Sequence, residues 1–267
     1  MKVLLTSGGA MAQKIANLIK ADMCSVRLLT DQQIAEVLGR YDVIIHTAAN
    51  IKCETLQTAI TDNFILTKRV LDTLYTNNKD ATFIYISSMS MLQSATEYLP
   101  VSSMSTYAFS KYLAEQYCIR HPLQNLLCVR FSTIFYEDAS KDGLSALVTN
   151  AVLQKKITIY NDGEARRDFI PLEKGMQKLI SLIPAIGKDG CRITNIASGR
   201  SYSFKEVAEI LKKNIPGLEV ENKDVGPGSE ILSEFPVSGN NPEPFFIDNY
   251  IFNFIEKLKS SASNNLQ

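Results

Sequence analysis

Apolar residues along the chain alternate between short runs and longer segments of helical period. Six short runs predict β-strands, several without polar alternation and therefore buried on both faces of a sheet; they cover residues 2–6, 26–30, 42–48, 82–87, 126–131 and 192–197. Four segments with apolar residues near i, i+3, i+4 and i+7 predict helices; they cover residues 12–20, 31–39, 55–75 and 107–120. This alternation predicts an α/β fold with a doubly wound parallel sheet.

The alternation loosens after about residue 132, where we expect a smaller lobe at the edge of the sheet. We assign residues 1–135 to the first domain and 136–259 to a mixed segment, of which elements within 143–215 partly return to the sheet. Helices are expected at 203–214, opened by Ser203, and near 247–259, with a loop over 226–246 between them. The polar tail 260–267 is expected to be disordered.

Composition narrows the class of partner. The chain has 28 basic and 28 acidic residues among 267, and no basic block suggests nucleic acid or an anionic membrane, so a small-molecule ligand is expected. Five cysteines without a C-x-x-C pair argue against a disulfide framework and against a zinc site, and no metal is expected. With no signal peptide and no membrane-spanning run, we expect a cytoplasmic protein.

The spacing Y-x-x-x-K occurs twice, at Tyr75–Lys79 and at Tyr107–Lys111. Ligands of a parallel sheet bind outside the carboxyl ends of the strands. Tyr75 and Lys79 lie at the far end of a predicted helix, on the opposite side, and are expected to be solvated. Tyr107 and Lys111 open the helix that follows the strand ending in Ser88, and their spacing places them on one helical face. Serine, phenol and ammonium can therefore converge at the site.

These three residue types suit hydride transfer between a carbinol carbon and a nicotinamide. The reaction requires a proton to reach or leave the oxygen near neutral pH, whereas a free phenol titrates near pH 10. A nearby ammonium is expected to lower the pKa of the Tyr107 phenol, while the Ser88 hydroxyl holds the substrate oxygen.

Several segments, in order, resemble the extended short-chain dehydrogenase/reductase family, in its NAD-dependent epimerase/dehydratase branch acting on nucleotide sugars. They are "DVIIHTAAN" (42–50), "DNFILTKRVLD" (62–72), "IYISSMS" (84–90), "STYAFSK" (105–111), "CVRFSTIFY" (128–136), "NDGEARRDFI" (161–170) and "TNIASGRSYSFKEVAEIL" (194–211). The resemblance covers roughly residues 1 to 215. It implies a Rossmann-like sheet, a small C-terminal substrate-binding lobe, and a homodimer formed by the helices around 55–78 and 105–120.

The resemblance also implies the roles of individual residues. Ser88, Tyr107 and Lys111 would be catalytic, and Asn63 would lie on a helix behind the site. Cofactor contacts are implied for Thr6, Gly8, Gly9, Ala10, Met11, Asp31, Thr47, Ala48, Ala49, Tyr107 and Lys111. Substrate contacts are implied for Ser88, Met89, Ser90, Thr133 and Arg167, of which Arg167 would meet the diphosphate.

The first turn departs from the family pattern T-G-x-x-G-x-x-G. Its glycines normally allow close approach of the backbone to the pyrophosphate, but here Ser7, Ala10 and Gln13 occupy the glycine positions and Gly8 and Gly9 are shifted. Only 40 positions separate Thr6 from His46, so a strand–helix unit of the first half is missing or merged into "VRLLTD". The sequence therefore does not distinguish NAD from NADP, and Asp31 can equally be read as a helix cap.

The residues after Ser88 bear on the reaction. Nucleotide-sugar 4,6-dehydratases carry Asp-Glu there, whereas this chain has Met89 and Ser90, which cannot exchange that proton. We expect reduction of a 4-keto sugar, with 4-epimerization as the alternative. A ligand-binding sensor or scaffold without turnover is the alternative of another class. We expect structural roles for His46, His121, Cys53 and Cys118, and a structural ion pair for Arg130.

Overall fold

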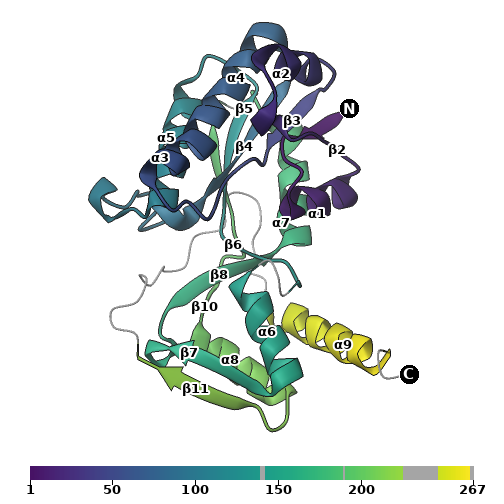
Figure 1. Cartoon of the computed structure of the whole chain (residues 1–267), viewed down its shortest axis with the longest axis vertical. Coiled ribbons are helices and arrows are strands. Elements are labelled where there is room, and N and C mark those ends of the chain that lie inside the picture. The colour runs from purple at the N-terminus through teal and green to yellow at the C-terminus, as the bar shows by residue number, and fades with distance from the viewer. Residues whose placement is uncertain (139–141, 189, 225–245, 265–267) are drawn as a thin grey trace. The chain divides into compact units, whose positions relative to one another are not determined.

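The computed structural model describes residues 1–138, 142–188, 190–224 and 246–264. It divides into two compact units, each described by itself (Figure 1). The first unit comprises residues 1–92, 96–131 and 176–196, and the second comprises 93–95, 132–175 and 197–267. No helix in the described part of the chain has the length and apolar character needed to cross a bilayer.

A six-stranded parallel sheet forms the centre of the first unit, as predicted. In spatial order its strands are β2 (Asp22–Met23), β1 (Val3–Leu5), β3 (Val43–His46), β4 (Thr82–Ser88), β5 (Leu126–Phe131) and β9 (Ile193–Ile196). Every neighbouring pair is parallel. The strands β1, β3 and β5 are buried along their whole length, which is why their sequences read as unbroken apolar runs.

The strand order explains the shortened first half. Order reverses between β1 and β3, and only β2 lies beyond β1, whereas a six-stranded dinucleotide-binding sheet has two strands there. The run 26–30, predicted as a strand, is instead the 3₁₀ helix η1 (Val26–Leu28). Leu28 is 90% exposed, and Thr30 forms a capping box with Gln33, so these residues begin the next helix instead of pairing in the sheet.

Helices cover both faces of this sheet (Figure 1). They are α1 (Ala10–Ile19), α2 (Asp31–Leu38), α3 (Leu56–Ala59), the π-helical segment η2 (Ile60–Ile65), α4 (Leu66–Asn77), α5 (Thr106–Arg120) and α7 (Leu172–Leu182). Short 3₁₀ turns are η3 (Met89–Met91), η4 (Val101–Ser103) and η6 (Ile183–Ala185). The segment predicted as one helix over 55–75 is thus continuous but widened to π geometry in its middle, a feature often found at functional sites.

The second unit contains two small sheets and three helices in its described residues. A three-stranded sheet has the order β10 (Ser201–Ser203), β8 (Arg166–Pro171) and β6 (Thr133–Phe135), and β7 (Lys156–Tyr160) pairs with β11 (Glu219–Lys223). The helices are α6 (Gly143–Gln154), α8 (Phe204–Asn214) and α9 (Asp248–Asn264), and η5 (Asn161–Gly163) is a 3₁₀ turn. Their apolar faces share one core, which includes Phe135, Phe169 and Phe254.

Both predicted C-terminal helices are present. Ser203 caps α8 through a capping box with Glu206. Helix α9 continues to Asn264. The expectation of a disordered tail is therefore wrong for residues 260–264, and residues 265–267 lie outside the described part. The expected loop over 226–246 also lies outside it, apart from Phe246.

Candidate active site

Ser88 and Tyr107 meet at the carboxyl end of β4. Ser88 is the last residue of that strand, and Tyr107 lies in the first turn of α5, which Ser105 caps by accepting a hydrogen bond from the Ala108 N–H at 3.1 Å. The Ser88 hydroxyl is near enough to the Tyr107 phenol to lower its pKa by hydrogen bonding. The strand end and the capped helix therefore bring together two of the three residues predicted to be catalytic.

Lys111 lies one turn farther along α5 and is only 2% exposed. Its Nζ atom donates a hydrogen bond to the Ile86 carbonyl at 2.6 Å and lies 4.1 Å from the centre of the Tyr85 ring. Burial lowers the pKa of Lys111 to about 8, although the surrounding groups, Glu115 among them, partly oppose the shift. The ammonium is thus held between a carbonyl and an aromatic face.

The pKa of Tyr107 differs from the prediction. Burial raises it to about 12, the hydrogen bond to Ser88 opposes the rise, and Cys53 adds to it. Lys111 is not among the groups that shift this pKa, because its ammonium is directed at Ile86 and Tyr85. The phenol is protonated at neutral pH, as an unperturbed phenol also is, and its catalytic role stays a prediction.

The two residues after Ser88 occupy different environments. The Ser88 hydroxyl accepts a hydrogen bond from the Ser90 N–H at 3.1 Å and donates one to the Ser90 hydroxyl at 2.9 Å. Ser90 is exposed, whereas the Met89 side chain is 2% exposed and packs in the interior. Neither residue can act as an acid or a base near neutral pH.

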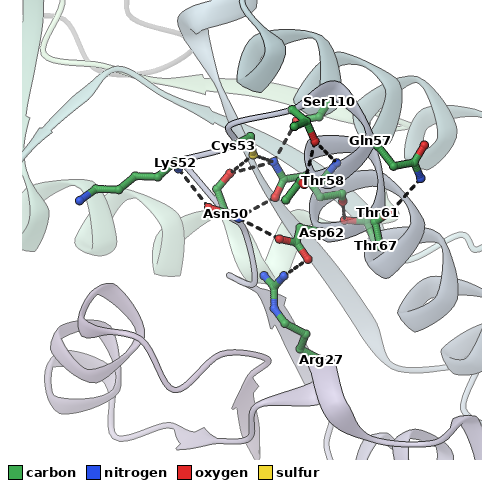
Figure 2. A network of polar contacts seen from close by, with 12 residues as sticks. Arg27, Asn50, Lys52, Cys53, Gln57, Thr58, Thr61, Asp62, Thr67 and Ser110 are labelled. Carbon is green, nitrogen blue, oxygen red and sulfur yellow. Dashed lines mark hydrogen bonds and ion pairs between the residues drawn. The ribbon is translucent and has the colours of Figure 1, made fainter.

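A polar network joins α5 to the π-helical segment and to the connection after β3 (Figure 2). The Asn63 amide, in the π-helical segment, donates to the Ser110 hydroxyl at 2.9 Å, and Ser110 donates to the Tyr107 carbonyl at 2.7 Å. Asn63 also bonds both backbone groups of Asn50, accepting from its N–H at 2.6 Å and donating to its carbonyl at 3.0 Å. Asn63 thus ties α5 to the connection after β3.

The same network reaches a charged pair that sequence reasoning did not single out. The Asn50 side chain donates to the Asp62 carboxylate at 2.8 Å, and that carboxylate forms an ion pair with Arg27 (Figure 2). No local motif could have shown these contacts, because their members come from segments far apart in the sequence. The members are Arg27, Asn50, Asp62 and Ser110.

His46 is a buried, neutral connector. Its Nδ1 atom lies 2.8 Å from the Thr6 hydroxyl and its Nε2 atom 3.0 Å from the Thr67 hydroxyl. Thr67 donates to the Asn63 carbonyl at 2.6 Å, so the hydrogen-bond pattern places the imidazole proton on Nε2. Burial lowers the pKa of His46 to about 3, and Thr6, predicted to contact the cofactor, uses its hydroxyl in this internal chain.

The first turn leaves room beside the start of α1. Gly9 is the N-cap of α1, and no side chain caps this end of the helix. A Cβ atom added at Gly8 would meet nothing within 4 Å, and one at Gly9 would meet only the Ser7 hydroxyl, at 3.4 Å. Gln13, at the third glycine position of the family, donates to the Gly8 carbonyl at 3.2 Å.

These features fit a dinucleotide. Backbone N–H groups at a helix N-terminus suit a diphosphate, and the Thr47 hydroxyl, just beyond β3, is buried without a hydrogen-bond partner in the described residues. Ala48 is buried and Ala49 and Met11 are half-buried, while Ala10 begins α1. The residues present could therefore hold a nicotinamide dinucleotide at this edge of the sheet.

Asp31 has a different partner. Its carboxylate forms an ion pair with Arg69, which also donates to the Leu29 carbonyl. The N-cap of α2 is Thr30, and Asp31 is the first helical residue. A negative charge at this position stabilises the helix through its interaction with the helix dipole. Asp31 thus begins α2 and pairs with Arg69 of α4, and its part in cofactor binding stays a prediction.

Thr133 and Arg167 belong to the second unit, and their part in substrate binding stays a prediction. Thr133 begins β6, and the half-buried Arg167, in β8, donates to the Arg166 carbonyl at 2.7 Å. Burial lowers the pKa of Arg167. Its neighbour Asp168 accepts from the N–H groups of residues 198 and 199 at 2.9 and 2.8 Å.

The predicted ion pair of Arg130 is confirmed. Its guanidinium donates to both carboxylate oxygens of Glu115 at 2.7–3.1 Å and to the Tyr98 hydroxyl at 2.6 Å. His121 is buried at the end of α5, where its Nδ1 atom accepts from the Leu123 N–H. Cys118 is buried, and Cys53, half-buried, donates to the Asn50 carbonyl at 2.9 Å.

Comparison with known proteins identifies the family. The family model "NAD dependent epimerase/dehydratase family" matches residues 2–173. A protein of Methanocaldococcus jannaschii, provisionally assigned as a UDP-glucose 4-epimerase, is 26% identical over 209 residues, which cover 70% of this chain and 66% of that protein. The chain thus spans slightly less than two thirds of this relative.

Solved structures share the fold. The NAD-dependent NDP-hexosamine 5,6-dehydratase TunA is 20% identical with a TM-score of 0.77, over 97% of this chain and 98% of that one. The dTDP-glucose 4,6-dehydratase of Bacillus anthracis, solved in complex with NAD, is 16% identical with a TM-score of 0.79, over 97% of each chain. At these identities the likeness concerns architecture.

Proposed function

The chain belongs to the NAD-dependent epimerase/dehydratase family, and we propose that it is an NAD(P)-dependent oxidoreductase that reduces the 4-keto group of a nucleotide-activated sugar. The observation that carries this proposal is the placement of Ser88, the last residue of β4, beside Tyr107 in the first turn of α5, with the Lys111 ammonium buried one turn farther along the helix. A protonated phenol is suited to give a proton to a carbonyl oxygen as that oxygen becomes an alkoxide.

The dinucleotide, when bound, supplies the hydride for carbon 4. The Ser88 hydroxyl donates a hydrogen bond to the 4-keto oxygen, exchanging its bond to Ser90 for one to the substrate. Tyr107 transfers its proton to the same oxygen. Lys111 exchanges its bond to the Ile86 carbonyl for one to the phenolate that remains, and stabilises it.

The residues beside Ser88 argue against elimination. Removing water across carbons 5 and 6 requires an acid for the leaving hydroxyl and a base for the carbon-bound proton, and Met89 and Ser90 supply neither. The site therefore supports proton and hydride exchange at one carbinol.

A 4-epimerase is the second candidate, favoured by the activity assigned to the Methanocaldococcus relative. Epimerization begins with oxidation, so Tyr107 would act first as a base and then as an acid. An epimerase must also retain its cofactor through both half-reactions. A sheet with one strand beyond β1 and a first turn without the family glycines favours a cofactor that is released.

A sensor or scaffold without turnover is the candidate of another class. It would retain the fold without requiring Ser88, Tyr107 and Lys111 together. Their joint presence, with Ser88 beside Tyr107, supports the enzyme.

The test is a panel of nucleotide sugars and their 4-keto derivatives with stoichiometric NADH or NADPH. Oxidation of the reduced cofactor by a keto sugar would support the proposal. Interconversion of sugars without net cofactor consumption would identify an epimerase, and a 4-keto-6-deoxy product from a simple hexose nucleotide would refute the inference from Met89 and Ser90. Binding without turnover of any of them would identify a sensor.

A further inference from the structure

The ion pair between Arg27 and Asp62 joins segments that follow β1 and β3, where the strand order reverses. In open α/β sheets this is the point at which a ligand-binding crevice forms. On one side, the Cys24 N–H donates to the Leu5 carbonyl at 2.9 Å and the Val26 N–H to the Thr6 carbonyl at 3.4 Å. These bonds hold η1 at the carboxyl end of β1. The backbone of Arg27 therefore lies at the carboxyl edge of the sheet, where dinucleotides bind.

Asp62 is connected to β3, the strand next to β1. It lies in the π-helical segment, and its carboxylate accepts a hydrogen bond at 2.8 Å from Asn50, which follows the end of β3 (Figure 2). The charge of Arg27 also contributes to lowering the pKa of His46, the last residue of β3. The guanidinium consequently lies near the β1/β3 switch point, on a turn whose Val26 N–H is bonded to Thr6 at the start of the first turn.

We propose that Arg27 binds the diphosphate of the dinucleotide cofactor, exchanging its contact with Asp62 for one with the phosphate oxygens. This inference rests on the proposed function, because it takes the crevice to be the cofactor site. A guanidinium matches the geometry of phosphate oxygens and stays charged at any working pH.

The first turn lacks the family glycines, and Arg27 can supply a contact to the diphosphate that they would otherwise allow the backbone to make. In the family pattern three glycines let the backbone enclose the pyrophosphate, but here Ser7, Ala10 and Gln13 hold those positions. Side chains at these positions hold the backbone farther from a pyrophosphate than glycine does, so more of the diphosphate charge is left for a side-chain cation. Arg27 provides such a cation.

Breaking the ion pair between Arg27 and Asp62 costs little free energy. The Arg27 and Asp62 side chains are 36% and 22% exposed, and an ion pair so near solvent adds little net free energy. Asp62 keeps its hydrogen bond from Asn50 after Arg27 leaves, so its carboxylate is not left without a partner. The pair thus holds the guanidinium near the crevice and competes only weakly with a dianion.

The test is calorimetric titration of the full-length wild-type protein and three variants with NAD and with NADP. Arg27→Gln should raise Kd for both dinucleotides by about tenfold or more, the usual effect of losing a charge-assisted hydrogen bond. Asp62→Asn keeps an acceptor for Asn50 but removes the competing charge, so it should lower Kd. Arg40→Gln is the matched control: it makes the same charge change at an exposed residue before β3 and should leave Kd unchanged.

Opposite effects of Arg27→Gln and Asp62→Asn would support the proposal, since a tighter-binding variant cannot be a misfolded one. Unchanged Kd values in Arg27→Gln would overturn it while leaving the proposed function intact. A loss confined to NADP would also overturn it, because the guanidinium would then read the 2′-phosphate. Wild-type protein that binds neither dinucleotide would refute the proposed function as well.

Discussion

The ammonium of Lys111 stands over the face of the Tyr85 ring, 4.1 Å from its centre. Burial lowers the pKa of Lys111 to about 8, so the lysine loses its charge as the pH rises through that value. If the cation stabilises the Tyr107 phenolate, kcat/KM for keto-sugar reduction should be level below about pH 8 and fall above it.

Variants of Tyr85 test this relationship. Tyr85→Leu removes the aromatic face and should move the falling limb to lower pH by up to about one unit, the scale of a cation–π interaction. Tyr85→Phe keeps the ring and removes only a buried hydroxyl that has no hydrogen-bond partner in the described residues. It should leave the limb in place, and a shift in Tyr85→Phe equal to that in Tyr85→Leu would contradict this account.

Tyr107→Phe should lower turnover by at least about 10²-fold, the usual loss when a general acid or base is removed. The ring remains, so cofactor affinity and thermal stability should change little. Steady-state kinetics and cofactor titration measure the two effects. Lys79→Gln, from the second Y-x-x-x-K pair, should have no measurable effect, and equal turnover in Tyr107→Phe would end the assignment.

His46 should make the protein sensitive to acid. Its pKa falls from 6.5 to about 3 in the fold, so the unfolded chain binds one more proton between these values. The free energy of unfolding should therefore fall as the pH drops below 6.5, by about 1.4 kcal/mol per pH unit from this residue. Urea unfolding of wild type and His46→Gln at several pH values tests this: the slope of the variant should be smaller by about that amount, and identical slopes would contradict it.

Arg130→Met should destabilise the protein because it leaves the Glu115 carboxylate buried without its partner. Breaking one side of a buried pair costs about 3–5 kcal/mol. The double variant Glu115→Gln/Arg130→Met removes both charges and should recover much of the loss in urea unfolding. Additive losses would show that the two side chains act independently.

A homodimer through the helices around 55–78 and 105–120 remains a prediction. The contacts expected for it include Phe64, Tyr112 and Tyr117. Phe64 and Tyr117 are half-buried and pack against each other, with ring centres 6.0 Å apart, and the half-buried Tyr112 packs against Tyr98. Ile65, on the same segment as Phe64, is 44% exposed. We expect light scattering at micromolar concentration to give the mass of a dimer and Ile65→Lys to give that of a monomer. Wild-type protein that is monomeric at this concentration would reject the prediction.

The apolar periodicity of the chain was sufficient to predict the parallel sheet, most of its helices and the meeting of Ser88 with Tyr107. Buried strands and amphipathic helices leave their pattern in neighbouring residues, and a strand end followed by a capped helix places side chains by local geometry alone. The capping residues Ser105 and Ser203 could likewise be read from the sequence around each helix start.

Contacts between distant segments were decided only in the tertiary structure. The strand after α1 is Asp22–Met23 and not residues 26–30. Leu4 and Leu5 of β1 pair with these two residues, and such pairing is not visible in the apolar pattern of residues 26–30 alone. The direction of the Lys111 ammonium depends on Ile86 and Tyr85, and the Arg27–Asp62 pair joins residues 35 positions apart. Periodicity and spacing carry no information about such contacts, because each depends on how the strands order in the sheet and on what burial does to a charge.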